Sequence, residues 1–486
     1  MTSDSNISNV RNPILLNLVF HAASDAIEKI KNIDYLADYA VPTHFNWVKV
    51  SYEENGLPNF HELGFLNGER DFSSFVSRGN GGKIDPGQID SYIALGEYGM
   101  SDQEFQRAAL PDRKNSNDDI FKFITQRLAN SIVERYMHLF SDQDFTPELC
   151  RTLYLPLERR IYQRDLQIKI IIPIIFLNFD FDEFQLADNA QVIKMTNELQ
   201  MGRAQTKFSG YDAIDQGALA GSTHALVLDN WSFHNDNYWS SVSVIQSNNI
   251  MDIIERFFAS IRMVRNVDTG YAQLIQLAVD WANDYVVNLP EISYELIRAY
   301  PPILQKRSLS NIDRPVISLN EMEEIAKVYS LLMHDDHSSL TIAVKRINAC
   351  YLRSSDEDSI IDTTIAMEAL FGDDENQEMT HKLALRMAAL SSLDERHERS
   401  AFDIFKDTKM IYKFRSKVVH GRKGKEIDKV RFINHPTGKV PAVEVALTNL
   451  RQAIRVFAES PQFLNPELID KTLLLSPKNE YTPFQD

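Results

Sequence analysis

The sequence predicts an α+β protein, with a mixed α/β N-terminal region over residues 1–310 and an all-α helical bundle over residues 311–486. Runs of β-branched and aromatic residues with the length of strands occur in the first region. Apolar residues recur at three- and four-residue spacing through the second. At 486 residues the chain exceeds what one hydrophobic core usually organises, and the proline-rich segment 300–315 is the expected linker.

The N-terminal region alternates expected strands and helices. A helix over 118–140 is predicted because Ile120, Ile124 and Leu128 keep helical spacing behind Asn117, a candidate N-cap. The other expected elements are strands over 43–52 and 222–231, two successive strands within 167–184, a loop around residues 79–82, and a helix over 249–265.

The C-terminal region reads as consecutive helices joined by short polar connections. Asp356 or Ser355 can cap the third of them, and Gly372 follows its end. Short connections favour antiparallel neighbours, which is typical of a helical bundle. The expected helices span 319–333, 338–353, 357–371, 378–391, 395–406, 409–420 and 441–458.

Composition narrows the class of protein. Hydrophobic residues make up 44% of the chain and charged residues 24%, as in ordinary globular proteins. The longest apolar run, 170–177, contains Pro173 and is far shorter than the roughly 20 residues of a spanning helix, so no membrane partner is expected. Cys150 and Cys350 are too few for a disulfide framework, which favours the reducing cytoplasm.

The segment 412–421 carries the residues best suited to catalysis. Arg415 offers a fixed fork of donors for a phosphate, and His420 is the type of side chain that exchanges protons near neutral pH. Ser416 and His420 share one helix face, whereas Arg415 lies about 140° around an ideal helix from His420. Gly421 is expected just past the helix end, where the helix dipole favours a protonated His420.

The surroundings of this motif resemble the HEPN superfamily, a family of four- or five-helix domains whose nuclease members carry Arg, four to six residues, then His. The match comprises DEDSIIDTTIAMEALF at 356–371, THKLALRMAAL at 380–390, and Arg-Ser-x-x-Val-His-Gly from residue 415. It covers roughly 320–460 and is most similar to the Apea-like branch, which occurs in bacterial proteins that abort phage infection. Many HEPN nucleases have Asn, Asp or His after the arginine, where this chain has Ser416.

The resemblance implies a function. We expect a metal-independent endoribonuclease in which His420 moves protons, Arg415 binds the phosphate and Ser416 adds a neutral hydrogen bond. The 2′-hydroxyl of RNA would attack the adjacent phosphorus, with no metal and no other cofactor. A symmetric homodimer is implied, because one histidine cannot conveniently serve both sides of an in-line reaction.

Charge is distributed unevenly around the motif. The net charge of −17 argues against a nucleic-acid partner, but residues 406–431 carry ten Lys and Arg against three Asp and Glu, a local net charge of +7. An acidic block at 356–378 precedes this basic window. The window predicts a salt-sensitive phosphate-binding groove for RNA, with tRNA as one candidate. Its expected substrate-binding residues are Lys413, Lys417, Arg422 and Lys423.

Other interpretations stay open from the sequence. The same helices could form a non-catalytic HEPN module for dimerisation or RNA binding, or His334 and His337 could serve a metal-dependent phosphohydrolase. Glu368 could orient Arg415 or the histidine, or pair structurally with Arg386 or Arg353. If the chain is an anti-phage effector, the N-terminal region would restrain the nuclease until a phage-encoded trigger is sensed.

Overall fold

The chain folds into two compact units in a computed structural model. Unit 1 comprises Met1–Pro173, Asn189–Val244 and Gln273–Ile297, and unit 2 comprises Ile174–Asp188, Ile245–Ala272 and Arg298–Asp486. The structure describes residues 10–33, 42–44, 47–63, 67–78, 82–111, 119–205, 216–240, 247–301, 314–334, 338–373, 378–394, 399–422, 424–436 and 438–475. Within these residues no helix combines the length and apolarity needed to cross a bilayer.

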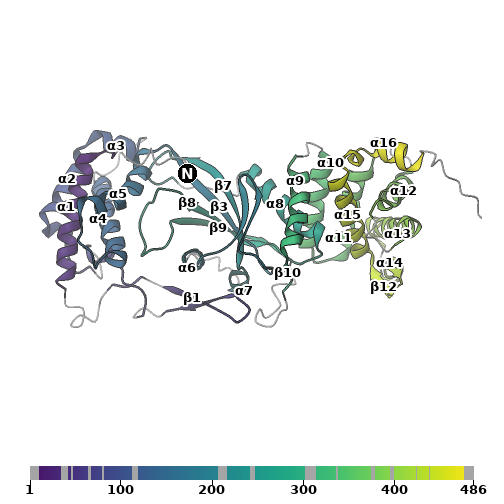
Figure 1. Ribbon diagram of the computed structural model, residues 1–486, viewed down its shortest axis with the longest axis horizontal. Helices are drawn as coiled ribbons and strands as arrows, with labels where there is room; N and C mark the ends of the chain where they lie inside the picture. Colours follow the sequence, from purple (N-terminus) through teal and green to yellow (C-terminus); the bar gives the residue numbers. More distant parts are fainter. Residues whose placement is uncertain are drawn as a thin grey trace, which may run out of the picture. The chain divides into compact units, whose positions relative to one another are not determined.

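The first part of unit 1 is a group of helices around one apolar core (Figure 1). Helices α1 and α5 begin at side-chain caps, since Asn12 accepts the N–H of Leu15 and Thr146 accepts that of Leu149. The long helix α4 packs against α1, α2 and α5, and its buried face includes Ile124, Leu128 and Ile132. The helices are α1 (Pro13–Lys31), α2 (Asp90–Ser101), α3 (Gln103–Ala109), α4 (Asp119–Leu139) and α5 (Pro147–Tyr162).

The rest of unit 1 is built on a sheet with the strand order β6-β7-β3-β8-β9. The central strand β3 is antiparallel to both neighbours, with Ile171 opposite Val227 on one side and Ile275 on the other. These three side chains form a core with Leu199 of the helix α6. The elements are β3 (Asp165–Pro173), β6 (Ala190–Lys194), α6 (Asn197–Gln205), α7 (Gln216–Ala220), β7 (His224–His234), β8 (Tyr271–Ala278), β9 (Ile292–Ala299) and the hairpin β1 (Val48–Tyr52) with β2 (Pro58–Glu62).

Unit 2 is mainly a helical bundle. Its earlier segments belong to it because Ala259 and Met263 of α8 share one buried core with the later helices. The short strands β4 (Asn178–Phe179) and β10 (Val316–Ile317) pair in parallel. The remaining elements are β5 (Glu183–Ala187), α8 (Asn248–Val264), α9 (Leu319–His334), α10 (Ser338–Leu352), α11 (Asp356–Phe371), α12 (Met379–Ser391), α13 (Ala401–Val419), α14 (Lys425–Arg431), β11 (Phe432–His435), β12 (Gly438–Pro441), α15 (Ala442–Glu459) and α16 (Pro466–Ile469).

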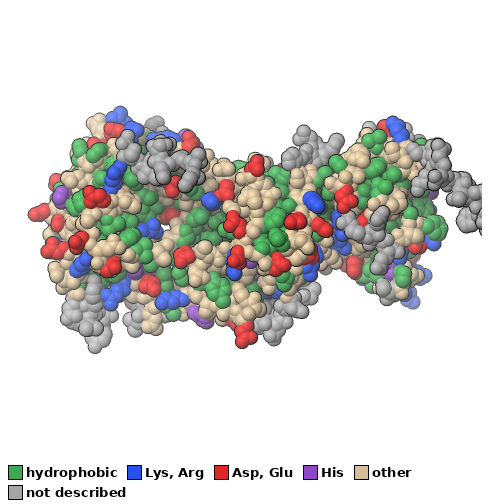
Figure 2. Space-filling model, viewed as in Figure 1, with side chains coloured by type: hydrophobic (Ala, Val, Ile, Leu, Met, Phe, Trp, Pro, Cys, Tyr) green, Lys and Arg blue, Asp and Glu red, His purple; other side chains and the backbone are tan. Residues whose placement is uncertain are grey.

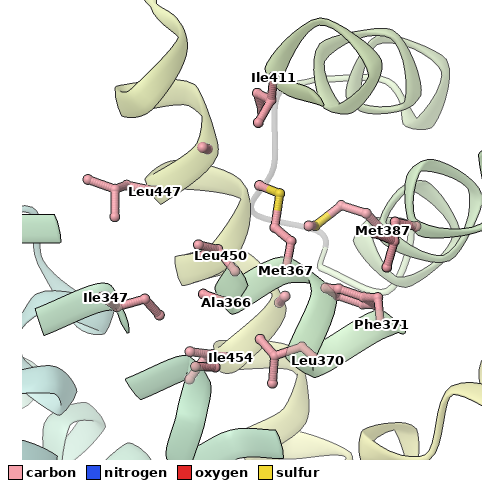
Figure 3. Packing of buried hydrophobic residues seen from close by; sticks show 14 of the residues in the cluster. Ile347, Ala366, Met367, Leu370, Phe371, Met387, Ile411, Leu447, Leu450 and Ile454 are labelled. Carbon is pink, nitrogen blue, oxygen red and sulfur yellow. The ribbon is translucent and has the colours of Figure 1, made fainter. Parts of the chain in front are cut away.

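Helices α11 and α15 supply the centre of the bundle core (Figure 3). Met367 and Phe371 of α11 lie near Met387 of α12, and Ile454 of α15 lies near Leu370 of α11 (Figure 3). All five side chains are buried, with exposures of 0–3%. Close packing of this kind fixes α11 against α12 and α13, so it also fixes the frame on which Glu368 and Arg415 sit.

The α+β fold class is confirmed, with a mixed N-terminal region and a helical C-terminal part. Two local expectations in the C-terminal region were wrong. The expected helices 395–406 and 409–420 are one helix in their described part, α13, and Thr408 lies within it with its hydroxyl donating to the carbonyl oxygen of Ile404 at 2.8 Å. The antiparallel hairpin β11–β12 interrupts the helices, with Gly438 in a left-handed conformation at φ 125°.

Several expected elements fall close to their observed bounds. The helix expected over 118–140 is α4, and the one expected over 249–265 is α8. Ser355, and not Asp356, caps α11 by accepting the N–H of Asp358 at 3.1 Å. Asn117 and most of the expected linker lie outside the described residues, and the division at residue 310 stays a prediction.

The N-terminal cap of α13 gives a first testable prediction. Ser400 Oγ accepts the N–H of Asp403 at 3.2 Å and donates to its carboxylate at 2.7 Å. Ser400→Ala is expected to lower the free energy of unfolding by about 1 kcal/mol, because the backbone donor loses its acceptor. Urea denaturation measures the change, and Ser400→Thr should retain most of the stability. An alanine variant as stable as the wild type would show that the cap contributes nothing.

Candidate functional site

The end of α13 has the geometry expected from the sequence. His420 is the C-cap, and its N–H donates to the carbonyl oxygen of Ser416 at 3.0 Å. Gly421 follows at φ 66°, and its N–H donates to the carbonyl oxygen of Val418 at 2.9 Å. The N–H of Arg422 donates to the carbonyl oxygen of Lys417 at 3.0 Å, so the turn at this left-handed glycine ends the helix and satisfies carbonyl groups of its last turns.

The apolar side of α13 is buried and its other side is exposed. Ile411 and Phe414 are fully buried, and Val418 is partly buried against the same core. Ser416 and His420 are exposed on the opposite side. No hydrogen bond or ion pair of the His420 imidazole occurs among the described residues, so the imidazole is available to a substrate or a partner.

Arg415 is held between the core and the solvent. Its side chain is 36% exposed, and Nη2 lies 4.0 Å from Oε1 of Glu368 on α11. Its Nε is buried and has no acceptor in the described part of the chain. One loose ion pair therefore leaves the outer donors of the guanidinium available for a phosphate. The structure does not join Arg415 to His420 by a hydrogen bond or an ion pair within the described part of one chain.

Glu368 pairs with Arg415, and neither structural alternative is observed. Arg386 binds Asp373 and Asp470 instead, at 2.8 and 2.7 Å, and Arg353 binds Asp362 at 2.8 Å. The carboxylate of Glu368 thus supports the guanidinium from the direction of α11.

Tyr412 of α13 is a neutral neighbour of the Glu368–Arg415 pair. Burial, together with the nearby Glu368 carboxylate, raises the pKa of the Tyr412 phenol above its ordinary value. Its hydroxyl lies 3.5 Å from the carbonyl oxygen of Thr364. Tyr412 therefore keeps its proton at neutral pH and cannot act as a base.

Two cations of the basic window, residues 406–431, lie beside a carboxylate of the same window. Lys417 Nζ donates to the carbonyl oxygen of Glu426 at 3.0 Å, and the Glu426 carboxylate lies 3.9 Å from both Lys417 and Arg422. Lys413 is exposed, and Lys423 lies outside the described residues. Basic and acidic side chains are interspersed on the face shown in Figure 2.

The upstream acidic block also reaches the basic window. Arg431 of α14 forms ion pairs with Glu357 and, at 3.5 Å, with Asp356. The local positive potential is therefore weaker than the net charge of the window suggests. Lys413 and the outer donors of Arg415 remain the best-placed cations for a phosphate.

No family model matches this chain. The comparisons with curated proteins and with solved structures give no match either. The HEPN resemblance therefore depends on the motifs at 356–371, 380–390 and 415–421, and the activity it implies is a proposal. The side chain of His334, together with residues 335–337, lies outside the described residues.

Unit 1 contains a polar cluster that the sequence interpretation missed. His44 Nε2 lies 2.6 Å from Oε1 of Glu134, and His138 Nε2 lies 3.3 Å from the same oxygen. Burial alone would raise the pKa of Glu134, but hydrogen bonds from His138 and His44 outweigh it and lower the pKa to about 2. Burial would lower the pKa of His138, but its bond to Glu134 raises it.

The sequence indicates that two of the three residues of this cluster lie together. Glu134 and His138 are four residues apart on the helix expected over 118–140, so they share a face. His44 is 90 residues from Glu134 along the chain. Only the fold could show that all three side chains meet.

Proposed function

We propose that the chain is a metal-independent endoribonuclease of the HEPN type whose active site lies at the end of α13. The observation that carries the proposal is the arrangement of three side chains there. His420 and Ser416 are exposed on one face, and Arg415 is half-buried, with Glu368 4.0 Å from Nη2 and its outer donors available. An imidazole can transfer the protons of a phosphate-transfer reaction without a metal, and a guanidinium and a hydroxyl can bind the phosphate oxygens.

Each residue has a defined role in the proposed reaction. His420 transfers a proton, either from the 2′-hydroxyl that attacks or to the 5′-oxygen that leaves. Arg415 binds the scissile phosphate and stabilises the charge that develops on its oxygens. Ser416 donates a neutral hydrogen bond to a phosphate oxygen. The products are a 2′,3′-cyclic phosphate and a 5′-hydroxyl.

The proposed enzyme acts as a homodimer. A second copy of α13 would bring a second His420 to the opposite side of the scissile bond, so one imidazole can act as base and the other as acid. A second copy could cover the apolar side chain of Val419, which is 53% exposed. Val419 directly precedes His420, which would place a contact surface beside the catalytic residue.

We further propose a biological setting consistent with the Apea-like resemblance. The nuclease would act in the cytoplasm as an abortive-infection effector against phage, and the N-terminal region would control it in response to a phage product. RNA cutting without such control would harm the host cell. RNA, with tRNA as one candidate, is the proposed substrate.

A non-catalytic HEPN module is the second candidate. It is favoured by the ion pairs of Glu426, which occupy Lys417 and Arg422, and by the absence of any bond between Arg415 and His420 in the described part of one chain. In this alternative the exposed ends of α13 serve dimerisation or RNA binding, and no bond in RNA is broken.

One experiment separates the two candidates. The purified full-length protein is incubated with total RNA, tRNA and single-stranded DNA, with and without EDTA, and the product ends are mapped. The nuclease predicts cyclic phosphate ends, the same rate in EDTA, and intact DNA because DNA lacks the 2′-hydroxyl. RNA binding without cleavage would favour the alternative module. Cleavage that stops in EDTA and returns with Mg²⁺ would contradict the metal-independent mechanism.

The support of Arg415 by Glu368 can be tested separately. Glu368→Gln is expected to lower kcat/KM less than about fivefold, since partly exposed ion pairs contribute about 0.2–1 kcal/mol. Glu426→Gln is the matched comparison, because it releases Lys417 and Arg422 and should strengthen RNA binding. A loss above about 100-fold in Glu368→Gln would instead mean that Glu368 acts in the chemical step.

The salt dependence of RNA binding tests how many cations of the basic window contact phosphate groups. Because Lys417, Arg422 and Arg431 have carboxylate neighbours, Lys413 should account for one of a few phosphate contacts. Lys413→Ala is expected to reduce the slope of log affinity against log salt by about 0.7 for single-stranded RNA. Fluorescence anisotropy measures it, with Lys471→Ala, paired with Glu467 at 3.1 Å, as the control. An unchanged slope would exclude Lys413 from the RNA contact.

A further inference from the structure

We propose that His44, Glu134 and His138 form a binding site for a divalent first-row transition metal, with Zn²⁺ as the best-suited ion. Two imidazoles and one carboxylate are a ligand set found in zinc sites. The ligand atoms of the three residues all lie within 4.8 Å of one another. They belong to unit 1, so the inference does not depend on the proposed nuclease in unit 2.

The two separations between the histidine nitrogens and the carboxylate oxygen are close to those expected around one small ion. Ligands placed about 2.0–2.1 Å from zinc in a tetrahedron lie about 3.3–3.4 Å from each other. The separation of 3.3 Å between His138 Nε2 and Glu134 Oε1 has this value, and that of 2.6 Å between His44 Nε2 and the same oxygen needs to widen by less than 1 Å. His44 lies before β1, outside any helix or strand, so its side chain can make this small adjustment.

Neighbouring groups orient the carboxylate toward the imidazoles. The N–H of Ser73 donates to Oε2 of Glu134 at 2.9 Å and that of Val287 donates to Oε1 at 3.3 Å, and the two contacts fix the carboxylate beside the histidines. Glu134 and His138 are one helical turn apart on α4, a rigid support for two ligands. Fixed outer contacts of this kind are typical of metal sites, where they set the orientation of the ligands.

The two histidines have oxygen neighbours outside the cluster. Nδ1 of His44 lies 4.0 Å from a carboxylate oxygen of Asp71, which can steady the imidazole from behind. The carboxylate of Asp71 is itself held by the N–H of Ser74 at 3.0 Å. His138 Nε2 lies 2.8 Å from the carbonyl oxygen of Arg70. In the metal-bound form this nitrogen would bind the ion and give up that contact.

A ligand from solvent can reach the site. His44 lines a cavity of about 430 Å³ in unit 1 together with polar residues such as Ser73, Asn130 and Ser131. Three protein ligands leave one position of a tetrahedral ion, and a water molecule from this cavity would fill it. The side chains of His44 and His138 are 15% and 11% exposed, so an ion can enter without unfolding of the helix.

The test is metal binding by the full-length protein after removal of any affinity tag and of bound metal. Titration with Co²⁺ should give the visible absorption of a tetrahedral ion at one equivalent, and Zn²⁺ should displace it. His44→Ala, His138→Ala and Glu134→Gln should each weaken Zn²⁺ binding at least about 100-fold, since ligand loss exceeds the 10–100-fold cost of losing an outer partner. His61→Ala, on β2 of the same unit, is the control and should bind like the wild type.

The outcomes are distinct. Zn²⁺ binding that survives equally in His44→Ala and His138→Ala, or a wild-type protein that gives no Co²⁺ spectrum, would overturn the proposal. If Glu134→Gln fails to fold, His44→Ala still tests the proposal. His44 is partly exposed and lies outside any helix or strand, so its replacement should not prevent folding. Melting temperature with and without Zn²⁺ gives a second measurement: it should rise in the wild type and stay unchanged in His44→Ala.

Discussion

Replacing His420 by alanine is expected to slow RNA cleavage by about 10²- to 10⁴-fold, the usual contribution of a positioned proton-transfer group. The exposed imidazole at the end of α13 has no competing partner among the described residues, so its loss removes only its own function. Arg415→Ala should lower the cleavage rate by about 10²- to 10³-fold, because the developing negative charge on the phosphate oxygens loses its strongest hydrogen-bond donor. Rates are measured under single-turnover conditions on a labelled RNA.

Matched variants make this result specific. His381→Ala removes an exposed histidine from α12 in the same unit and should cleave at the wild-type rate. Ser416→Ala should lower the cleavage rate about tenfold or less, since a neutral hydrogen bond contributes about 1 kcal/mol. If a folded, dimeric His420→Ala protein retains full activity, the proposed catalytic role of the histidine is wrong.

Glu134→Ala is expected to lower the free energy of unfolding of the EDTA-treated protein by about 3–5 kcal/mol, as when one partner of a buried ion pair is removed. The Glu134 side chain is fully buried and takes hydrogen bonds from His44, from the N–H of Ser73 and from the N–H of Val287. The substitution leaves these donors without their acceptor. Urea denaturation monitored by circular dichroism measures the loss.

The control for this prediction is an exposed carboxylate of the same unit. Glu104 is 67% exposed and pairs with Arg11 at 3.1 Å, so Glu104→Ala should change stability by less than about 0.5 kcal/mol. A loss below about 1 kcal/mol for Glu134→Ala would show that the buried cluster is not a major source of stability.

The same cluster predicts how the stability of the EDTA-treated protein depends on pH. The folded-state pKa of Glu134, about 2, lies below its ordinary value of 4.5. Its contribution is therefore present above pH 4.5 and is lost as the pH falls from 4.5 toward 2. The pKa of His138 is raised above 6.5, so its contribution is complete below pH 6.5 and is lost at higher pH. Urea denaturation at pH values from 3 to 8 measures this dependence. The midpoint concentration of urea should vary less with pH in Glu134→Gln than in the wild type.

The sequence by itself determined the local features of this protein. Periodic apolar residues predicted α4 and α8 within a residue of their bounds, and the buried stripe of Ile411 and Phe414 on α13. Gly421 marked the end of that helix. These predictions succeed because helix periodicity and termination depend on residues a few positions apart.

The tertiary structure alone decided which distant side chains meet. It paired Glu368 with Arg415 and Glu357 with Arg431, and these carboxylates from outside residues 406–431 reduce a positive charge that a count over those residues overstates. It also brought His44 to the Glu134 carboxylate across 90 residues. Such contacts depend on how helices and loops pack against each other, which no local spacing of residues encodes.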